Sequence, residues 1–507
     1  MKTTLSAAAA LVLALAGPSS FAQVSASTTQ SGSNNSAFTH QRGPTELLTA
    51  TIVQNGSGNR AGDPASASGG IEQLDNDVGA RASIAQGGEN NDAGTRQIRS
   101  YLVDALVLQD GSGNLARIEQ NNASRSQAAA DQGGTDNRAR IVQEEVGDVS
   151  VGVIQRGSGN QAEVTQRRTG FGGTRVEQNG TANSARVSQT DGIYQSTEIT
   201  QTGSMNAIDV TQTDSTIVRI NATQDGTSNR AGLAQSGESN DIVLTQQGNG
   251  NQASITQRMF ANSAQVSQVQ NGNAVTIVQE GSPGMQEQPN VASVVQTGNE
   301  NQAKIHQRSG VLNLVDISQY GNRNRAETEQ QQPANRLFAS IFQLGDDNVA
   351  SMTFGEVGEE AGGALRQFGD ANRSTLVQGE GFVGFATIDQ SGIGNRSEVR
   401  QAGGAPLQVA FHTQTGIDNI GSISQRDGAL RAVMTQTGTD NEASIMQDGG
   451  SGNAEIGQEG SLNVAWIRQS APAGSAYNNA TISQIGTGLS GEIVQTGGGN
   501  NAALVQR

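Results

Sequence analysis

Amides are the side chains with hydrogen-bonding chemistry that recur most regularly in this sequence, since each Gln or Asn both donates and accepts. They stand in a fixed unit, Gln-x-Gly-x-x-Asn-x-Ala-x-Val-x-Gln, which occupies residues 155–166. The same frame begins again 23 residues later at Gln178, and it returns along most of the chain. A repeat of this length predicts a solenoid, in which each repeat stacks on its neighbours.

The unit has two strand-like halves joined by a glycine-rich turn. Residues 160–166 alternate, so Asn160, Ala162, Val164 and Gln166 fall on one face of a strand. This face is uniform from repeat to repeat, whereas the face formed by 161, 163 and 165 changes charge and size. We therefore place the uniform face inside. The glycines at 157 and 159 suit a tight turn that needs positive φ.

Buried amides are costly unless each one finds a partner, at about 1–3 kcal/mol for an unpaired group. If successive coils stack about 4.8 Å apart, each amide can bond to the identical amide of the next coil, as in the Asn and Gln ladders of cross-β structure. The sequence thus predicts a set of ladder and turn residues as the structural and self-assembly site. These residues are Gln109, Gly111, Asn114, Ala116, Gln120, Gln132, Gly134, Asn137, Ala139, Gln143, Gln155, Gly157, Asn160, Ala162, Gln166, Gln178, Gly180, Asn183, Ala185, Gln189, Gln495, Gly497, Asn500, Ala502 and Gln506.

The predicted fold is all-β, a two-sheet β-solenoid of about 20 stacked strand-turn-strand coils with a period of 22–24 residues. The directions of the strands are left open. The alternative is a disordered low-complexity tract, but disorder needs no fixed positions, and here Gln, Gly, Asn and Ala return in phase. A composition of 34% hydrophobic and 3% aromatic residues fits a thin core of Val, Ile, Leu and Ala.

Residues 1–22 have the pattern of a secretory signal peptide, with an apolar run from Leu5 to Ala16. A transmembrane anchor is the alternative, but the run is too short to span a bilayer. We expect a short leader at 23–29 and then the repeat array at 30–507, with irregular loops near 62–70, 280–289 and 470–477. The repeat pattern continues through 500–506, so an open strand edge is expected there.

Few residues are suited to catalysis or metal binding. The chain has no Cys, and its three histidines, His40, His306 and His412, are far apart in sequence. Its glycine-rich turns lack the Walker lysine motif and the glycine-aspartate pattern of calcium-binding solenoids. The net charge of −16 disfavours nucleic acid as a partner. We therefore expect no enzyme activity, no cofactor, no metal, no nucleic-acid partner and no membrane insertion.

The variable face offers a second indication of stacking. The same outward position in consecutive repeats holds Arg117, Arg140, Glu163, Arg186 and Asp209, so from Arg140 onward stacked coils would bring opposite charges together. Each such pair contributes only about 0–1 kcal/mol in water, so we interpret them as guides to register. Unrelated surface charges are the alternative.

The frame resembles the curlin repeat, whose pattern is Ser, five residues, Gln-x-Gly-x-x-Asn-x-Ala, three residues and Gln. The full pattern stands at Ser126, Gln132, Gly134, Asn137, Ala139 and Gln143. The resemblance covers nearly the whole chain after the signal peptide. Two differences are that the leading Ser is often replaced and that this chain has many more repeats than typical curlins.

The resemblance implies a secreted subunit of curli, the functional amyloid fibres of Gram-negative bacterial surfaces and biofilms. It implies other copies of the chain as partners, together with other curli subunits or a nucleator and an outer-membrane secretion pore. The short leader leaves the export route open. Two other functions fit a solenoid: a monomeric surface adhesin, and an ice-binding protein, for which a flat row of outward Thr would be expected.

Overall fold

The computed structural model of the chain describes residues 24–43, 47–62, 70–281, 289–308, 310–331, 334–355, 357–379, 382–403 and 407–507. The chain divides into two compact units, Met1–Asn249 and Gly250–Arg507. The predicted signal peptide and most of the expected loops near 62–70 and 280–289 lie outside the described residues. The two units are built alike, and each is described by itself.

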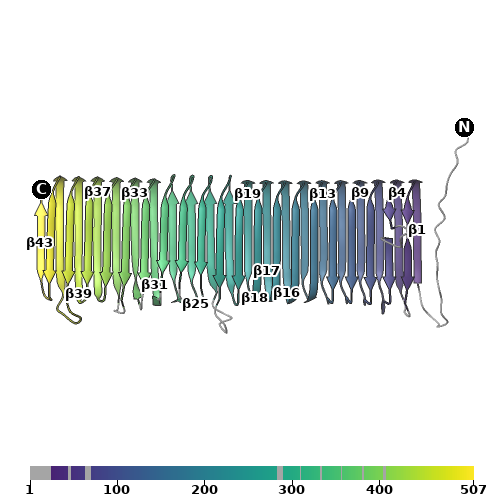
Figure 1. The fold of residues 1–507 in the computed structure, drawn as a ribbon, viewed down its shortest axis with the longest axis horizontal. Helices are drawn as coiled ribbons and strands as arrows, with labels where there is room; N and C mark the ends of the chain where they lie inside the picture. Colours follow the sequence, from purple (N-terminus) through teal and green to yellow (C-terminus); the bar gives the residue numbers. More distant parts are fainter. Residues whose placement is uncertain are drawn as a thin grey trace, which may run out of the picture. The chain divides into compact units, whose positions relative to one another are not determined.

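Every regular element in the described part of the chain is a β-strand (Figure 1). The strands come in pairs along the sequence, and each pair is separated by a short turn. We call one such pair a coil, with a first strand before the glycine turn and a second strand after it. Among the described residues, no helix has the length and apolar character needed to cross a membrane.

In the first unit, the first strands stack on one another to form one sheet, and the second strands form another. The first-strand sheet contains β1 (Val24–Ser33), β4 (Leu48–Ser57), β7 (Arg81–Glu89), β9 (Asp104–Ser112), β11 (Gln127–Thr135), β13 (Ser150–Ser158), β15 (Gly173–Thr181) and β19 (Asp241–Asn249). The second-strand sheet contains β2 (Ser36–Ala37), β3 (Thr39–Arg42), β5 (Arg60–Ala61), β6 (Gly70–Leu74), β8 (Asp92–Ile98), β10 (Leu115–Asn121), β12 (Arg138–Glu144), β14 (Gln161–Gly170) and β18 (Arg230–Glu238). The long strands β16 (Ser184–Ser204) and β17 (Ala207–Thr227) run through both sheets.

The second unit has the same two sheets. Its first-strand sheet contains β21 (Asn262–Val269), β23 (Asn290–Thr297), β26 (Leu314–Tyr320), β29 (Phe338–Leu344), β31 (Val357–Asp370), β33 (Phe382–Ile393), β35 (Gln408–Ile417), β37 (Ala429–Thr439), β39 (Ser451–Ser461), β41 (Asn478–Thr487) and β43 (Asn501–Gln506). Its second-strand sheet contains β20 (Gln252–Arg258), β22 (Ala274–Glu280), β24 (Gln302–Gln307), β27 (Arg325–Gln330), β30 (Val349–Phe354), β32 (Arg373–Gly379), β34 (Arg396–Ala402), β36 (Ile420–Arg426), β38 (Glu442–Asp448), β40 (Val464–Ser470) and β42 (Ser490–Thr496). The short strands β25 (Gly310–Val311) and β28 (Ala334–Asn335) pair beside them, and 471–477 joins β40 to β41 without strand.

Neighbouring coils pair in parallel and in register, which settles the strand directions that the sequence left open. On β13, for example, Gln155 lies opposite Gln132 of the preceding coil and Gln178 of the following coil. Parallel, in-register stacking is what brings identical side chains together at every step. The prediction of an all-β solenoid is confirmed, with about 19 turns and a period of about 23 residues.

The predicted assignment of the two faces is also confirmed. Val153 and Val164 are fully buried between the two sheets, and Gln155 and Asn160 are buried beside them. Gln161, which alternates with these residues, is exposed. The core is therefore a narrow layer in which small apolar side chains share space with amides.

The glycine turn is fixed by the stacking as well as by its own backbone. Gly157 has φ of 107°, a conformation that L side chains rarely adopt. A Cβ at Gly157 would also lie 2.1 Å from the carbonyl oxygen of Gly180 in the next coil. A side chain at this position would thus push two coils apart, so the recurrence of glycine here has a physical cause.

Candidate functional site: the amide ladders

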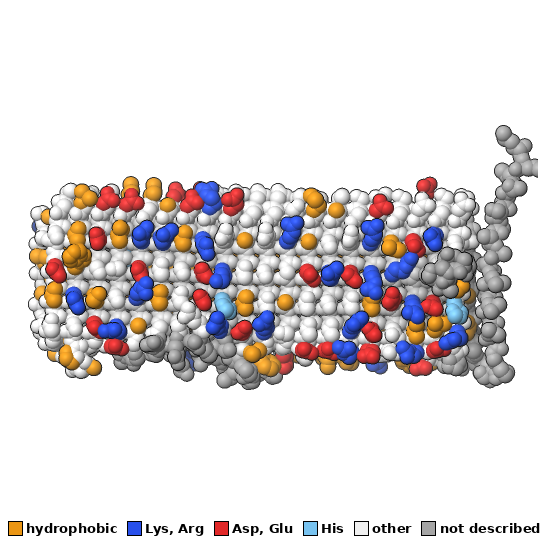
Figure 2. Space-filling model, in the orientation of Figure 1, with side chains coloured by type: hydrophobic (Ala, Val, Ile, Leu, Met, Phe, Trp, Pro, Cys, Tyr) orange, Lys and Arg blue, Asp and Glu red, His pale blue; other side chains and the backbone are white. Residues whose placement is uncertain are grey.

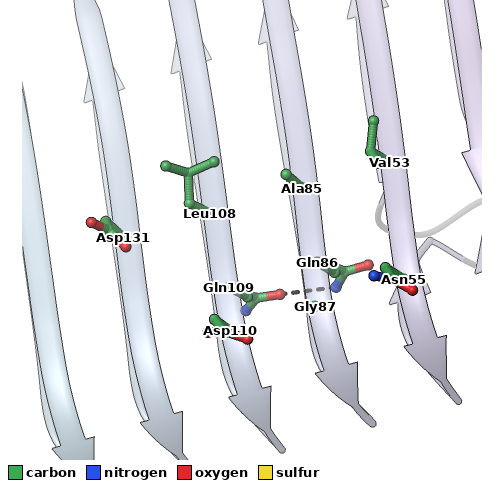
Figure 3. A pocket seen from close by; sticks show the side chains of 9 residues that line it. All are labelled: Val53, Asn55, Ala85, Gln86, Gly87, Leu108, Gln109, Asp110 and Asp131. Atoms are coloured by element: carbon green, nitrogen blue, oxygen red, sulfur yellow. Dashed lines mark hydrogen bonds between the residues drawn. The ribbon is translucent and has the colours of Figure 1, made fainter.

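The first strands carry a continuous row of glutamines that bond to one another between coils. Figure 3 shows one step, in which Gln86 Nε2 donates to Gln109 Oε1 over 2.9 Å. The row continues through Gln132, Gln155 and Gln178 with a distance of 2.8 Å at each step. In the second unit, the equivalent row includes the 2.8 Å bonds from Gln296 to Gln319 to Gln343 to Gln367.

The second strands carry a parallel row of glutamines. Gln120 donates to Gln143 over 2.8 Å, Gln143 to Gln166 over 3.0 Å and Gln166 to Gln189 over 2.7 Å. In the second unit, Gln401 Nε2 donates to Gln425 Oε1 over 2.8 Å. At each of these steps one coil is therefore joined to the next by a glutamine bond, in addition to the backbone bonds.

The second N–H of these amides links the two sheets, a role that the sequence did not predict. Gln155 Nε2 also donates to the backbone oxygen of Arg138 over 2.9 Å, and Gln178 Nε2 donates to that of Gln161 over 2.9 Å. Both side chains are fully buried. Because the amide bonds along the stack and across the core, none of its hydrogen-bonding groups needs water.

The asparagines that follow the turn form a third ladder with a different pattern. Asn160 donates to Asn137 Oδ1 from its backbone N–H and from Nδ2, both over 3.0 Å. Its Nδ2 also donates to the backbone oxygen of Gly180 in the following coil, over 2.9 Å. One asparagine thus fastens the turns of three consecutive coils, which explains why Asn and Gly recur at a fixed spacing.

The ladders have a direction. Within each unit, the glutamine Nε2 donates towards the following coil, as Gln155 does to Gln178 and Gln343 does to Gln367. A coil added after the last one would therefore accept hydrogen bonds from its glutamines, and a coil added before the first one would donate to the glutamines of that coil. Stacking that preserves the ladders must join coils in one orientation.

The residues predicted as the self-assembly site can now be placed. Those between 109 and 189 lie in the first unit, where the glutamines and asparagines form the ladders described above and the alanines Ala116, Ala139, Ala162 and Ala185 are buried. The five predicted residues between 495 and 506 do not form a hairpin of the same kind. Gln495 accepts a bond from Gln469 in the second-strand sheet, and Gln506 accepts one from Gln484 in the first-strand sheet.

The repeat pattern predicted Gln495 on a first strand and Gln506 on a second strand. The structure has them the other way round, so the predicted position of this last repeat is wrong by half a coil. The spacing of Gln495, Gly497 and Asn500 spans the link between two coils, where the backbone N–H of Asn500 donates to Asn478 Oδ1. Gln235 and Asn240 show the same spacing at such a link in the first unit. The two kinds of turn share a sequence pattern because both must close between stacked amides.

The outward charges on the second-strand sheet pair between coils. Glu163 lies between Arg140 and Arg186, with nitrogen-to-oxygen distances of 3.1 Å and 3.3 Å. Arg117 instead pairs with Asp92 of the preceding coil over 2.9 Å. Figure 2 shows basic and acidic side chains interspersed in this way on the face that it displays. These exposed pairs contribute little stability and favour the correct register.

One hollow of about 290 Å³ lies on the outer face of the first unit (Figure 3). It forms because Ala85 and Gly87 on β7 are shorter than side chains on the flanking strands, among them Val53 and Leu108. The residues around it include no histidine and no basic side chain. The hollow is a gap between side chains of unequal length on a flat sheet, and it brings together no acid-base pair for catalysis.

A break in the second-strand ladder occurs at Phe354. Phe354 stands in register between Gln330 and Gln378, at a position that holds Gln in the neighbouring coils, and it is fully buried. Gln378 still donates to Gln401 over 2.8 Å, but its Oε1 has no hydrogen-bond partner. The aromatic ring removes the donor that this oxygen would otherwise accept from, at a cost of about 1–3 kcal/mol.

This break predicts an unusual order of stabilities. Phe354→Gln should be more stable than Phe354→Leu, because Gln supplies Gln378 with a donor whereas Leu leaves it without one. At Met352, a buried position on the same strand outside the ladder, the order should be the usual one, with Met352→Leu more stable than Met352→Gln. Unfolding by denaturant measures all four free energies, and finding Leu favoured at both positions would contradict the ladder.

His412 is a second exception in the core. Its ring is buried on β35 between Ile388 and Met434 of the neighbouring coils. It bonds to the hydroxyl of Ser397, and a Cβ at Gly421 would lie 2.2 Å from its Cε1. Positions 397 and 421 hold Ala in most repeats, so the two substitutions make room for the ring and give it a partner.

The environment of His412 changes its ionisation. Burial lowers the pKa of His412 to about 4, below its ordinary value of 6.5, and a weaker interaction with Gln436 acts in the opposite direction. The side chains of Ile388, Met434 and Ser397 that pack against it carry no titratable group. The charged imidazolium is therefore excluded from the folded chain at neutral pH.

This exclusion predicts a loss of stability in acid. Between pH 6.5 and about 4 the unfolded chain binds a proton at His412 and the folded chain does not, so the free energy of unfolding should fall as pH falls. The loss should approach roughly 3 kcal/mol. Denaturant unfolding at pH 7 and pH 4.5 measures it, and His412→Met should reduce the difference. An equal reduction by His306→Gln, which changes an outward side chain, would contradict the assignment.

Two segments of the chain match the family described as Curlin associated repeat, at residues 219–248 and 438–470. One match lies in each unit, and both contain ladder glutamines, including Gln224, Gln235, Gln447 and Gln458. A search of curated proteins found no match to the chain.

Proposed function

Because the chain belongs to the curlin associated repeat family, we propose that it is a secreted structural protein whose copies stack end to end into extracellular, curli-like amyloid fibres. In this proposal the fibres serve surface adhesion and form part of a biofilm matrix, as pilus-like structures on a Gram-negative bacterium. The partners are further copies of the chain, and they also include other curli subunits or a nucleator and an outer-membrane secretion pore. No catalytic role is proposed.

The observation that carries this proposal is the direction and continuity of the amide ladders. A ladder that joins coils inside one chain can join the last coil of one chain to the first coil of the next, since the groups and spacings are the same. At one end of the second unit, Gln506 accepts from Gln484 and donates to the backbone oxygen of Ser490 over 2.8 Å. A coil stacked on β43 would offer this amide the acceptor that the interior ladder glutamines such as Gln155 find in the next coil.

The backbone of β43 supports the same proposal. The N–H groups that follow each Asn in the interior coils donate to the next coil, as Arg138 does to the oxygen of Asn160. The N–H groups of successive residues in a strand point alternately to its two sides, so the N–H of Ala503 points away from β41, the strand that pairs with β43. Edge groups of this kind pair readily with another strand. A monomeric adhesin is the competing function. A fibre subunit assembles into filaments, whereas a monomeric adhesin does not.

The proposal predicts the mass of the fibre per unit length. The chain has 507 residues and a mass of 52.3 kDa, so one coil of about 23 residues corresponds to about 2.4 kDa. A single filament of stacked solenoids should therefore contain about 2.4 kDa for each layer of about 4.8 Å, and a bundle of filaments should contain a whole multiple of that mass. Scanning transmission electron microscopy of fibres from the purified mature protein measures this mass, and fibre diffraction measures the layer spacing.

Two other outcomes would contradict the proposal in different ways. A mass near 52.3 kDa for each layer would mean that whole chains, rather than coils, form the layers. Protein that stays monomeric at high concentration, even with preformed seeds, would favour the adhesin.

A further inference from the structure

One outer face of the second unit concentrates the aromatic residues of the chain. Of 11 Phe in the sequence, five point outward from the neighbouring strands β29, β31, β33 and β35, and Tyr320 on β26 adjoins them. We call the outward side chains of these five strands the aromatic face. Its rings are Tyr320, Phe338, Phe342, Phe368, Phe385 and Phe411, and four of the six are 36–41% exposed.

This concentration is not required by the core, since these side chains lie outside it. Phe342 lies between Tyr320 and Phe368, with ring centroids 5.7 Å and 5.5 Å apart. Only 3% of the chain is aromatic, so a cluster of exposed rings on adjacent coils is a marked departure from its composition. Exposed apolar clusters of this kind mark sites of interaction with another molecule.

The aromatic face is uneven in a regular way. Gly362 on β31 lies in register between Phe338 on β29 and Phe385 on β33. The ring of Phe385 leans over this glycine, with its Cδ2 atom 3.4 Å from the place of a Cβ, so Gly362 itself is buried. Ala364 on the same strand is also short and lies at the bottom of the face. The face therefore combines projecting rings with short side chains on β31.

A charged pair at the centre of the face is incompletely satisfied. Arg366 on β31 and Asp389 on β33 are in register, but the nearest nitrogen and oxygen atoms are 3.6 Å apart, too far for a hydrogen bond. The Oδ1 atom of Asp389 is buried without a hydrogen-bond partner. Partial burial raises the pKa of Asp389, although its side chain remains 37% exposed. The exposed part of this carboxylate is open to a donor from another molecule.

We propose that the aromatic face binds the same face of a second copy of this chain, with the two stacks antiparallel. The two-fold axis runs along the strand direction, between β31 and β33. A strand of one copy then lies opposite a different strand of the other: β31 faces β33, and β29 faces β35. Pairing of a patch with itself about a two-fold axis is the usual geometry of protein dimers.

This arrangement matches the face to itself in shape and in charge. Arg366 of each copy faces the exposed part of Asp389 of the other, so opposite charges meet twice. Phe385 of one copy faces Gly362 of the other. Phe411 faces Ser340, and Phe368 faces Ser391, so that a large side chain meets a small one in each case.

The other two-fold arrangement, with an axis along the stack, gives a poorer match. It would place Phe338 opposite Leu344 of the second copy, and Arg366 opposite Ala364. Large side chains would then collide, and Asp389 would face Thr387 rather than a basic group. The sequence of the face thus selects the antiparallel arrangement.

The size of the face sets the strength expected of the pair. Five strands at about 4.8 Å, each with about seven residues at about 3.3 Å, span roughly 500 Å² on each copy. The roughly 1,000 Å² buried in total is at the lower limit for a specific interface. A single pair of chains should therefore dissociate readily, whereas filaments that pair along their length through many such faces should stay together.

Charge reversal tests the proposed contact in a way that a general loss of folding cannot imitate. Arg366→Asp and Asp389→Arg each place like charges opposite each other in a homodimer, and each should weaken dimerisation by at least about tenfold. An equal mixture of the two variants should dimerise again, because every contact in the mixed dimer then joins opposite charges. Sedimentation equilibrium of freshly refolded full chain measures dimerisation of the two single variants and of their mixture. Arg426→Asp, which changes a residue on the other sheet, is the control and should leave dimers intact.

The same variants separate this proposal from the proposed fibre. If fibres form, the mass per layer should be about two coils for the native chain and one coil for each single variant, with unchanged elongation. If fibres do not form, sedimentation still measures the dimer. Native protein that sediments as a monomer up to millimolar concentration, single variants that dimerise like the native chain, or a mixture that fails to recover would each overturn the face-to-face contact.

Discussion

The structure depends on one constraint: an amide buried between two sheets must have its hydrogen bonds satisfied by protein. Gln155 meets this constraint by bonding to Gln132 and Gln178 along the stack and to the backbone of Arg138 across it. All of these bonds require neighbouring coils to be in register. A slip by one residue would place the amides outside and charged residues inside, so the ladders select a single alignment.

The same constraint leaves the outward residues free to differ between coils. Outward positions carry the opposite charges around Glu163 in the first unit and the aromatic face in the second, while the inward positions scarcely change. The surface of each unit can therefore acquire a local property without altering the fold. Exceptions inside need compensation, as Ser397 and Gly421 provide for His412, or leave a group unsatisfied, as at Gln378.

The sequence predicted the fold and the faces because a two-residue alternation combined with a 23-residue step admits few structures. Val164 and Gln166 were placed inside from this pattern alone. The pattern could not predict that Gln155 bonds across the core, because its partner on β12 is set by how far the sheets lie apart. The pattern placed Gln495 on the wrong strand of its coil because the turn within a coil and the link between coils both use Gln, Gly and Asn. Only strand pairing distinguishes the two kinds of turn. Self-assembly by these residues remains a prediction.

Hydrogen exchange of the side-chain amides tests the ladders most directly. Protons on Nε2 of Gln155 and Gln178 are buried and bonded on both sides, so they should exchange only when the coil opens, as slowly as the core backbone amides. Protons on Nε2 of Gln161, which is exposed, should exchange at the rate of a free amide. NMR of the folded chain after transfer to deuterated water resolves the two classes. Rapid exchange at Gln155 and Gln178, with the core backbone still protected, would contradict the account.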